Sequence, residues 1–181
     1  DVTIEHFAQR GTTNVALVLS KSKESLRVSV GGLLAVSWGW THSEPLLAEL
    51  LEGAGLDAAA IGYEDLAVAR KLRGVLSKAP FICANVRDGD TPIAKPYLIR
   101  SRVAFLAVTQ IPAHRRKSFD AAGWTIDDPA AALKILVPEA AKSADLLVLL
   151  AVMDRLEAAE LAKEFPGIGI VLVPSFGLND P

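Results

Sequence analysis

Short runs of valine, isoleucine, leucine and alanine alternate along this chain with segments of helical spacing, and this alternation limits the possible folds more than any other feature. Apolar runs of strand length are typical of strands that are covered on both faces. Helices between such strands supply the cover, so we expect an α/β fold. The candidate strands are residues 14–19, 26–30, 58–62, 81–86, 103–109, 146–152 and 168–173.

Helical spacing is clearest in three segments. The first begins at Ser43-Glu44-Pro45, where a capping residue precedes an early proline, and it ends near Gly53. The second spans residues 64–78, with leucines on one face and basic residues mostly on the other. The third begins after Asp128-Pro129 and continues to about Ala140. A shorter helix, residues 154–164, is predicted after the strand at 146–152.

One stretch departs from the alternation of strand and helix. Residues 96–100 and 103–106 are β-rich runs joined by Ser101-Arg102, which is the spacing of a tight hairpin. We therefore expect a mixed rather than a purely parallel sheet. Residues 87–95, which include Gly89 and Pro92, are the best candidate for a surface loop. At this length we expect one domain, residues 1–181.

Charge, hydropathy and cysteine content exclude several classes of function. The net charge is −2, and no basic run exceeds Arg115-Arg116-Lys117, so we expect no nucleic-acid partner. The longest apolar run, residues 146–153, is much shorter than the roughly 20 residues that a membrane-spanning helix needs. The single cysteine, Cys83, lies in an apolar run and is predicted to be a buried thiol, and one cysteine provides neither a zinc knuckle nor a haem attachment. We expect no cofactor.

Four stretches carry a family resemblance in their order and spacing: residues 55–62, 81–86, 96–109 and 144–150. They resemble the strands and hairpin of the calcineurin-like metallophosphoesterase domain of secreted 5′-nucleotidases. The resemblance covers most of the chain from Val28 onward. It implies a metallophosphoesterase-like four-layer αββα fold, a mixed β-sandwich flanked by helices, and a periplasmic or extracellular location.

The chemistry of that family requires two adjacent divalent metals, which Asp, Asn and His side chains hold. At the matching positions this chain has Gly32 in place of the bridging carboxylate, and Tyr63 and Glu64 in place of the ligand Asn and His. Val152 stands where a His is expected, and Ser175 falls in the last histidine motif. Glycine and valine have no donor atom. The resemblance therefore implies no catalytic residue and no metal, with a vestigial site lined by Gly31, Gly32, Tyr63, Glu64, Asp65, Val152 and Ser175.

The remaining polar and aromatic residues have more than one interpretation. Glu64 and Asp65 line any vestigial pocket or, as we favour, complement the positive end of the helix that follows. The pair Gly31-Gly32 is better explained by a tight turn than by a phosphate site. Trp38 and Trp40, with His42 beside them, form either an exposed interaction surface or, if buried, a plug for the empty site.

We therefore predict a non-catalytic pseudophosphoesterase that acts as a protein-binding or assembly module. A domain without these metal ligands resembles domains that are found with bacterial multihaem cytochromes. We therefore also predict, more specifically, that the partner is a multihaem cytochrome. The rival is a divergent phosphoesterase or nucleotide-binding hydrolase with a relocated site that uses Glu64, Asp65 and His42. A third alternative is that this sequence is part of a longer chain. Because it ends soon after Ser175, we expect no second, base-binding domain.

Overall fold

A computed structural model describes residues 26–34, 51, 53–71 and 73–174 of the protein. In these residues, strands form three sheets. The first sheet is parallel and contains, in order, β1 (Val28–Val30), β2 (Ala58–Ala60) and β3 (Phe81–Ile82). The second contains, in order, β10 (Ile170–Leu172), β9 (Leu146–Val152), β7 (Val103–Thr109) and β6 (Tyr97–Arg100), of which only β6 runs antiparallel to its neighbour. A small antiparallel sheet contains β5 (Thr91–Pro92), β4 (Val86–Asp88) and β8 (Trp124–Ile126).

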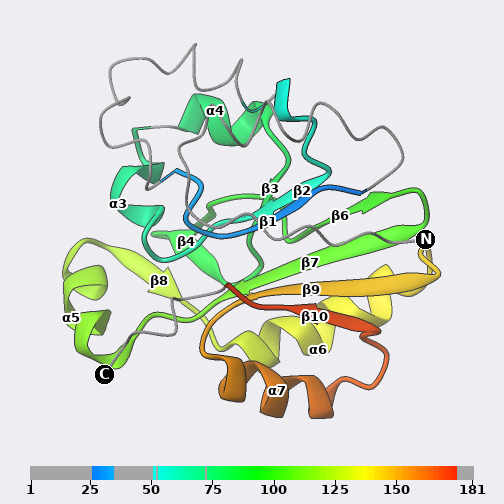
Figure 1. Ribbon diagram of the computed structural model, residues 1–181. Coiled ribbons are helices and arrows are strands. Elements are labelled where there is room, and N and C mark those ends of the chain that lie inside the picture. The colour runs from blue at the N-terminus through cyan, green and yellow to red at the C-terminus, as the bar shows by residue number, and fades with distance from the viewer. Residues whose placement is uncertain (1–25, 35–50, 52, 72, 175–181) are drawn as a thin grey trace.

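The two larger sheets lie face to face between layers of helices (Figure 1). On the outer face of the first sheet lie α3 (Leu66–Ala69) and α4 (Arg73–Lys78), and on the outer face of the second lie α6 (Pro129–Ala140) and α7 (Arg155–Glu164). A further helix, α5 (Ala113–Ala121), packs beside β8. The predicted mixed sandwich flanked by helices is therefore confirmed.

Period-2 alternation along the strands explains the layers. In β7, Ala104, Leu106 and Val108 contact the α6–α7 layer, whereas Phe105 and Ala107 face the first sheet. Because successive side chains of a strand point to opposite faces, a strand that is apolar at every position is buried on both. Strand β2 follows the same rule with three alanines. Ala58 and Ala60 face the second sheet, and Ala59 faces the core that includes α3.

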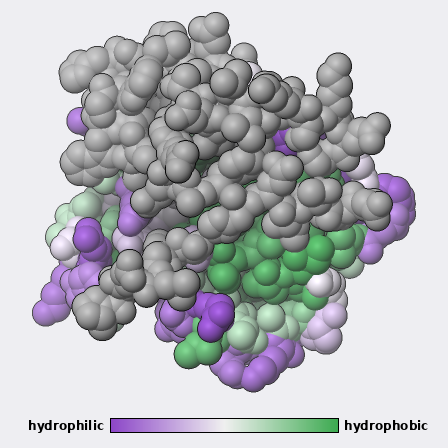
Figure 2. Space-filling view, viewed as in Figure 1, coloured by the Kyte–Doolittle hydropathy of each residue, from purple (hydrophilic) through white to green (hydrophobic). Residues whose placement is uncertain are grey.

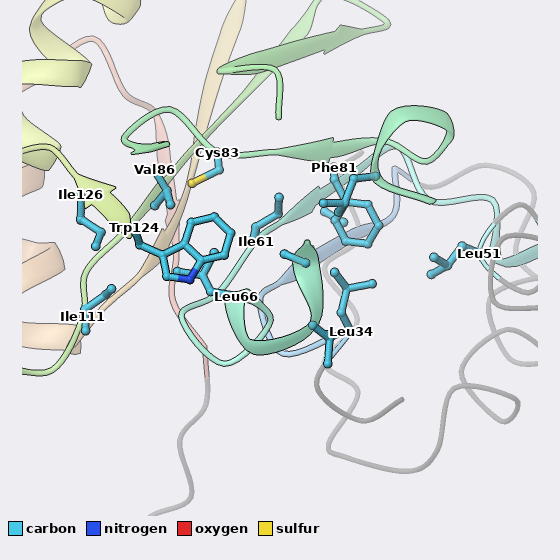
Figure 3. Packing of buried hydrophobic residues seen from close by; sticks show 14 residues of the cluster. Leu34, Leu51, Ile61, Leu66, Phe81, Cys83, Val86, Ile111, Trp124 and Ile126 are labelled. Atoms are coloured by element: carbon cyan, nitrogen blue, oxygen red, sulfur yellow. The ribbon is translucent and has the colours of Figure 1, made fainter. Parts of the chain in front are cut away.

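The core outside the first sheet joins that sheet to the helices and to the small sheet (Figure 3). Leu66 of α3, Ile61 after β2 and Phe81 of β3 belong to this cluster, and Trp124 and Ile126 of β8 extend it. Since these residues come from segments far apart in sequence, the cluster fixes the small sheet against the sandwich.

Several predicted elements are confirmed at or near their boundaries. Strands β7 and β9 have the predicted ends, and the Ser101-Arg102 turn joins β6 to β7, with positive φ angles of 48° and 64°. Asp128 caps α6 by accepting a hydrogen bond from the Ala131 N–H, and Asp154 caps α7. Among the helices of the described residues, none combines the length and the apolar character needed to cross a bilayer.

Three local predictions are wrong. The predicted strand 81–86 is interrupted, because the Cys83 N–H binds the Lys95 carbonyl and the Ala84 N–H binds the Ala107 carbonyl instead of continuing the ladder with β2. The predicted helix 64–78 is two short helices, and the Lys71 N–H binds the Val68 carbonyl three residues back in a tight turn. The predicted loop 87–95 contains β4 and β5, which turn at Gly89.

Besides β5, helix α5 and strand β8 were not predicted. Helix α5 has no buried residue, so its sequence carries no apolar stripe. The predicted strand 14–19 lies outside the described residues, and so does most of the helix predicted from Ser43, of which Leu51 is buried in the core.

Candidate functional site

The chain leaves β1, β2 and β9 at the same edge of the sandwich, where the resemblance places the metal site. Gly31, Gly62 and Val152 meet there in close contact. A Cβ on Gly31 would lie 3.1 Å from Val152 Cγ1 and 3.2 Å from Gly62 Cα. Gly31 and Gly32 have φ angles of 79° and 73°, which glycine adopts without strain. The backbone turn favoured for this pair is therefore present, and the close approach it permits is to Gly62.

Asp65 holds this corner together from inside the protein. Its side chain is fully buried, and Oδ2 accepts hydrogen bonds from the Gly32 N–H at 2.9 Å and the Gly62 N–H at 2.8 Å. Oδ1 accepts a third from the Leu34 N–H at 2.7 Å. Since a buried carboxylate is tolerated only when it is well hydrogen-bonded, these three donors explain how the charge is accommodated. Asp65 thus ties the loop after β1 to the turn after β2.

Asp65 occupies the N-cap position of α3, and its favoured interpretation as a charge that complements the positive end of this helix stays a prediction. The Asp65 side chain makes no capping hydrogen bond to α3, because both oxygens point to the loop N–H groups described above. Glu64 is exposed, and its Oε1 accepts a hydrogen bond from the Tyr63 hydroxyl at 3.2 Å. A Cβ on Gly32 would lie 3.7 Å from Glu64 Oε2. The structure therefore brings Gly31, Gly32, Glu64, Asp65 and Val152 to one corner.

This corner does not fit a pair of divalent metals. Where the resemblance expects an imidazole, the γ-methyl groups of Val152 pack against Gly31 and leave no donor. The carboxylate that remains buried, that of Asp65, already accepts three backbone N–H groups. Across the described residues, no group of three or more His, Cys, Asp or Glu side chains is arranged to hold a metal ion. A two-metal site needs several converging nitrogen and oxygen ligands.

A buried polar network lies next to this corner. The Asn85 amide donates to the carbonyls of Thr109 and Asp127, at 2.8 and 3.0 Å, and its oxygen accepts from the Thr109 N–H at 2.8 Å. The Thr109 hydroxyl donates to the Ile61 carbonyl. Cys83 lies beside them, fully desolvated, and burial raises the pKa of its thiol to about 11. At neutral pH the thiol is protonated, which confirms a buried structural cysteine rather than a nucleophile.

The remaining predicted site and interaction residues have different outcomes. Ser175 and the Trp38, Trp40 and His42 group lie outside the described residues. Tyr63 is half-buried and packs on the core that includes Leu66. His114 lies exposed on α5.

Sequence reasoning missed the part that Asp65 and Gly62 play in this corner. The signal was present in the segment Gly62-Tyr63-Glu64-Asp65, where a glycine follows a buried strand and an acid follows three residues later. A carboxylate at that spacing can return to the glycine N–H, as the 2.8 Å bond shows. The two bonds to Gly32 and Leu34 span more than 30 residues and have no local signature.

The comparison with known sequences gives one curated relative. The chain is 32% identical over 136 residues to the uncharacterized metallophosphoesterase YunD of Bacillus subtilis strain 168. The match spans 68% of this chain but only 29% of that protein. No family model matches the chain.

Solved structures share the fold. Over 90% of this chain, the sulfate thiohydrolase SoxB of Thermus thermophilus superposes with a TM-score of 0.69 at 18% identity, and a 5′-nucleotidase precursor of the same species with 0.65 at 19%. The NAD nucleotidase NadN of Haemophilus influenzae gives 0.63 at 16% identity, also over 90% of the chain. The chain covers 34%, 34% and 31% of these proteins, respectively. At such identities the likeness establishes the fold alone, and it is the predicted one.

The Asp65 carboxylate generates a matched pair of substitutions. In Asp65→Asn an amide NH₂ replaces one oxygen and faces backbone donors, so at least one buried N–H loses its acceptor. We expect the free energy of unfolding, measured in urea, to fall by about 3 kcal/mol. The neighbouring exposed change Glu64→Gln is expected to alter the free energy of unfolding by less than about 0.5 kcal/mol. Equal effects of the two substitutions would show that the Asp65 hydrogen bonds do not hold the corner.

Proposed function

We propose that this chain, which has the metallophosphoesterase fold and is related in sequence to a metallophosphoesterase, is a non-catalytic pseudophosphoesterase that acts as a protein-binding or assembly module. The observation that carries the proposal is the corner at the ends of β1, β2 and β9. Val152 presents methyl groups there, Gly32 presents no side chain, and the Asp65 carboxylate is engaged by backbone N–H groups. Residues that cannot hold two cations cannot acidify a bridging water or clamp a phosphoryl group.

The apolar edges of the sandwich support a protein-binding role. Among the described strands, β1 and β10 each lie at one edge of their sheet, and every residue of both is only half-buried. Figure 2 shows apolar surface in the region where β9 and β10 lie in Figure 1. Half-exposed apolar residues on a strand edge are suited to contact with another protein.

In the specific version of the proposal, the partner is a multihaem cytochrome and both proteins lie in the periplasm or outside the cell. The resemblance described for the sequence motivates this partner. The solved neighbour that is described as a 5′-nucleotidase precursor supports the location, since a precursor is processed to its mature form. The chain would contribute packing surface rather than redox chemistry.

The rival proposal, a hydrolase with a relocated site, requires Glu64 and Asp65 to act as ligands or as an acid–base pair. Asp65 is fully buried and engaged by three N–H groups, whereas Glu64 is exposed, so the two carboxylates face different environments. His42 lies outside the described residues. The geometry therefore favours the non-catalytic proposal.

Metal binding and hydrolysis test the proposal directly. The purified protein, titrated with manganese chloride in a calorimeter, is expected to give no binding heat at micromolar metal and no turnover of p-nitrophenyl phosphate above background. The matched variant is Gly32→Asp with Val152→His, which introduces two donors at the corner formed by Gly31, Gly32 and Val152. We expect this variant to bind manganese at least tenfold more tightly than the unchanged protein. Metal-dependent turnover by the unchanged protein would refute the non-catalytic assignment.

The proposed partner has a separate test. The tagged chain is co-expressed with a multihaem c-type cytochrome, and the affinity-purified material is examined for haem absorbance at ~410 nm, a wavelength common to such haems. We expect the cytochrome to co-elute with this chain and to be lost when Ile170 and Leu172 of β10 are changed to lysine. Elution of a colourless protein from the co-expressing cells would contradict the cytochrome proposal and leave the metal prediction standing.

A further inference from the structure

A pocket of about 640 Å³ lies away from the strand-end corner, between the α3–α4 helices and the segment that leads from β5 to β6. None of Gly31, Gly32, Glu64, Asp65 or Val152 lines it. Its volume falls within the range of roughly 300–1,000 Å³ that is typical of small-molecule sites. We call it the cationic pocket, after the five basic side chains among its lining residues: Arg70, Arg73, Lys78, Lys95 and Arg100.

The interior of the cationic pocket is apolar. Leu51, Leu76, Phe81 and Trp124 line it and belong to the core outside the first sheet, and Leu98 of β6 adds to the lining. Phe81 and Trp124 are almost fully buried and form the floor under the pocket, whereas Ile93 and Leu98 are half-buried and expose apolar surface to it. Apolar walls with a few polar groups at the rim are characteristic of sites that enclose a small molecule.

The rim carries a strong local excess of positive charge. Among the described residues that line the pocket, five are basic and none is acidic, although the whole chain has a net charge of −2. Asp88 lies beside it and pairs with both Arg70 and Arg73, and so offsets one charge. Throughout the described part of the chain, Lys78, Lys95 and Arg100 form no ion pair, which leaves them available to an anion.

One of these cations is held rigidly. The Arg70 guanidinium donates to Asp88 Oδ1 from Nε at 3.1 Å and from Nη2 at 2.7 Å, and it lies 4.3 Å from the centre of the Trp124 ring. The hydrogen bond from Arg70 also lowers the pKa of Asp88, so the pair stays charged well into the acid range. A cation that is already fixed loses little conformational entropy when a ligand binds.

We propose that the cationic pocket binds a small organic anion with an apolar body, such as an aryl or short alkyl carboxylate or sulfonate. The apolar body lies against Ile93 and Leu98, and the anionic group meets the basic rim. A neutral molecule of the same shape gains only the apolar contact, and an inorganic anion gains only the charge. This site is independent of the proposed protein-binding role.

Two fluorescent probes of closely similar shape test the proposal. The first, 1-anilinonaphthalene-8-sulfonate, is an amphiphilic anion, and the second, N-phenyl-1-naphthylamine, lacks the sulfonate. The unchanged protein is expected to bind the anion at least tenfold more tightly than the neutral probe at low salt. Raising sodium chloride from about 0.05 to about 0.5 M is expected to weaken binding of the anionic probe severalfold. The affinity for the neutral probe is expected to change less than about twofold, because salt screens only the charge.

The location is tested with a matched pair of double variants. Lys95→Glu with Arg100→Glu is expected to weaken binding of the anionic probe at least tenfold and to change the neutral probe less than twofold. The control, Lys134→Glu with Lys142→Glu, reverses two positive charges at exposed positions outside the pocket. It is expected to leave the affinities for the anionic and the neutral probe unchanged. Circular dichroism checks that both double variants are folded. If the Lys95→Glu, Arg100→Glu variant does not fold, the salt titration of the unchanged protein still tests the proposal. Equal binding of the two probes by the unchanged protein, or equal loss in the two double variants, would overturn the proposal.

Discussion

The strand-end corner of this protein depends on one buried carboxylate. Asp65 accepts hydrogen bonds from the N–H groups of Gly32, Leu34 and Gly62, and so joins the loop after β1 to the turn after β2. Charge-assisted hydrogen bonds of this kind are roughly twice as strong as neutral ones, and they stabilise loops whose backbone has no ladder to join. The glycines at positions 31 and 62 are the other half of this arrangement, because a Cβ at either position would be tightly crowded by its neighbours. The corner is therefore complete without an ion.

The rest of the sandwich is independent of that corner. Alternating residues of β7 and β9 fill the space between the sheets on one side and the space under α6 and α7 on the other. Burial of this apolar surface, at roughly 25 cal/mol per Å², is the dominant favourable contribution to folding, and it does not involve the residues at the strand ends. The metallophosphoesterase fold therefore does not depend on metal ligands at these strand ends. Fold and chemistry are separate properties of such a chain, so the site has to be argued from its own residues.

How much of this was predictable depends on whether the signal was local. Strands β7 and β9 and helix α6 carry a continuous apolar run or a capping aspartate within a few residues, and their boundaries followed from the sequence. Helix α5 buries no side chain, so nothing in its pattern distinguished it from a loop. The break after Ile82 arises because Cys83 and Ala84 bond to Lys95 and Ala107, partners more than ten residues away. The resemblance predicted that Gly32 and Val152 offer no metal-ligating atom. The hydrogen bonds from the Gly32 and Leu34 N–H groups to Asp65 could be found only in the structure.

The position of manganese in a crystal is the most direct test of the central claim, that the ends of β1, β2 and β9 cannot cage two cations. Crystals of the protein are soaked in manganese chloride, and anomalous differences are measured near the manganese absorption edge. The account predicts no anomalous peak beside Gly32, Glu64 and Val152, with the Asp65 oxygens still bound to the loop N–H groups. A pair of peaks about 3.5–4 Å apart at that corner, the spacing of two-metal hydrolases, would contradict it.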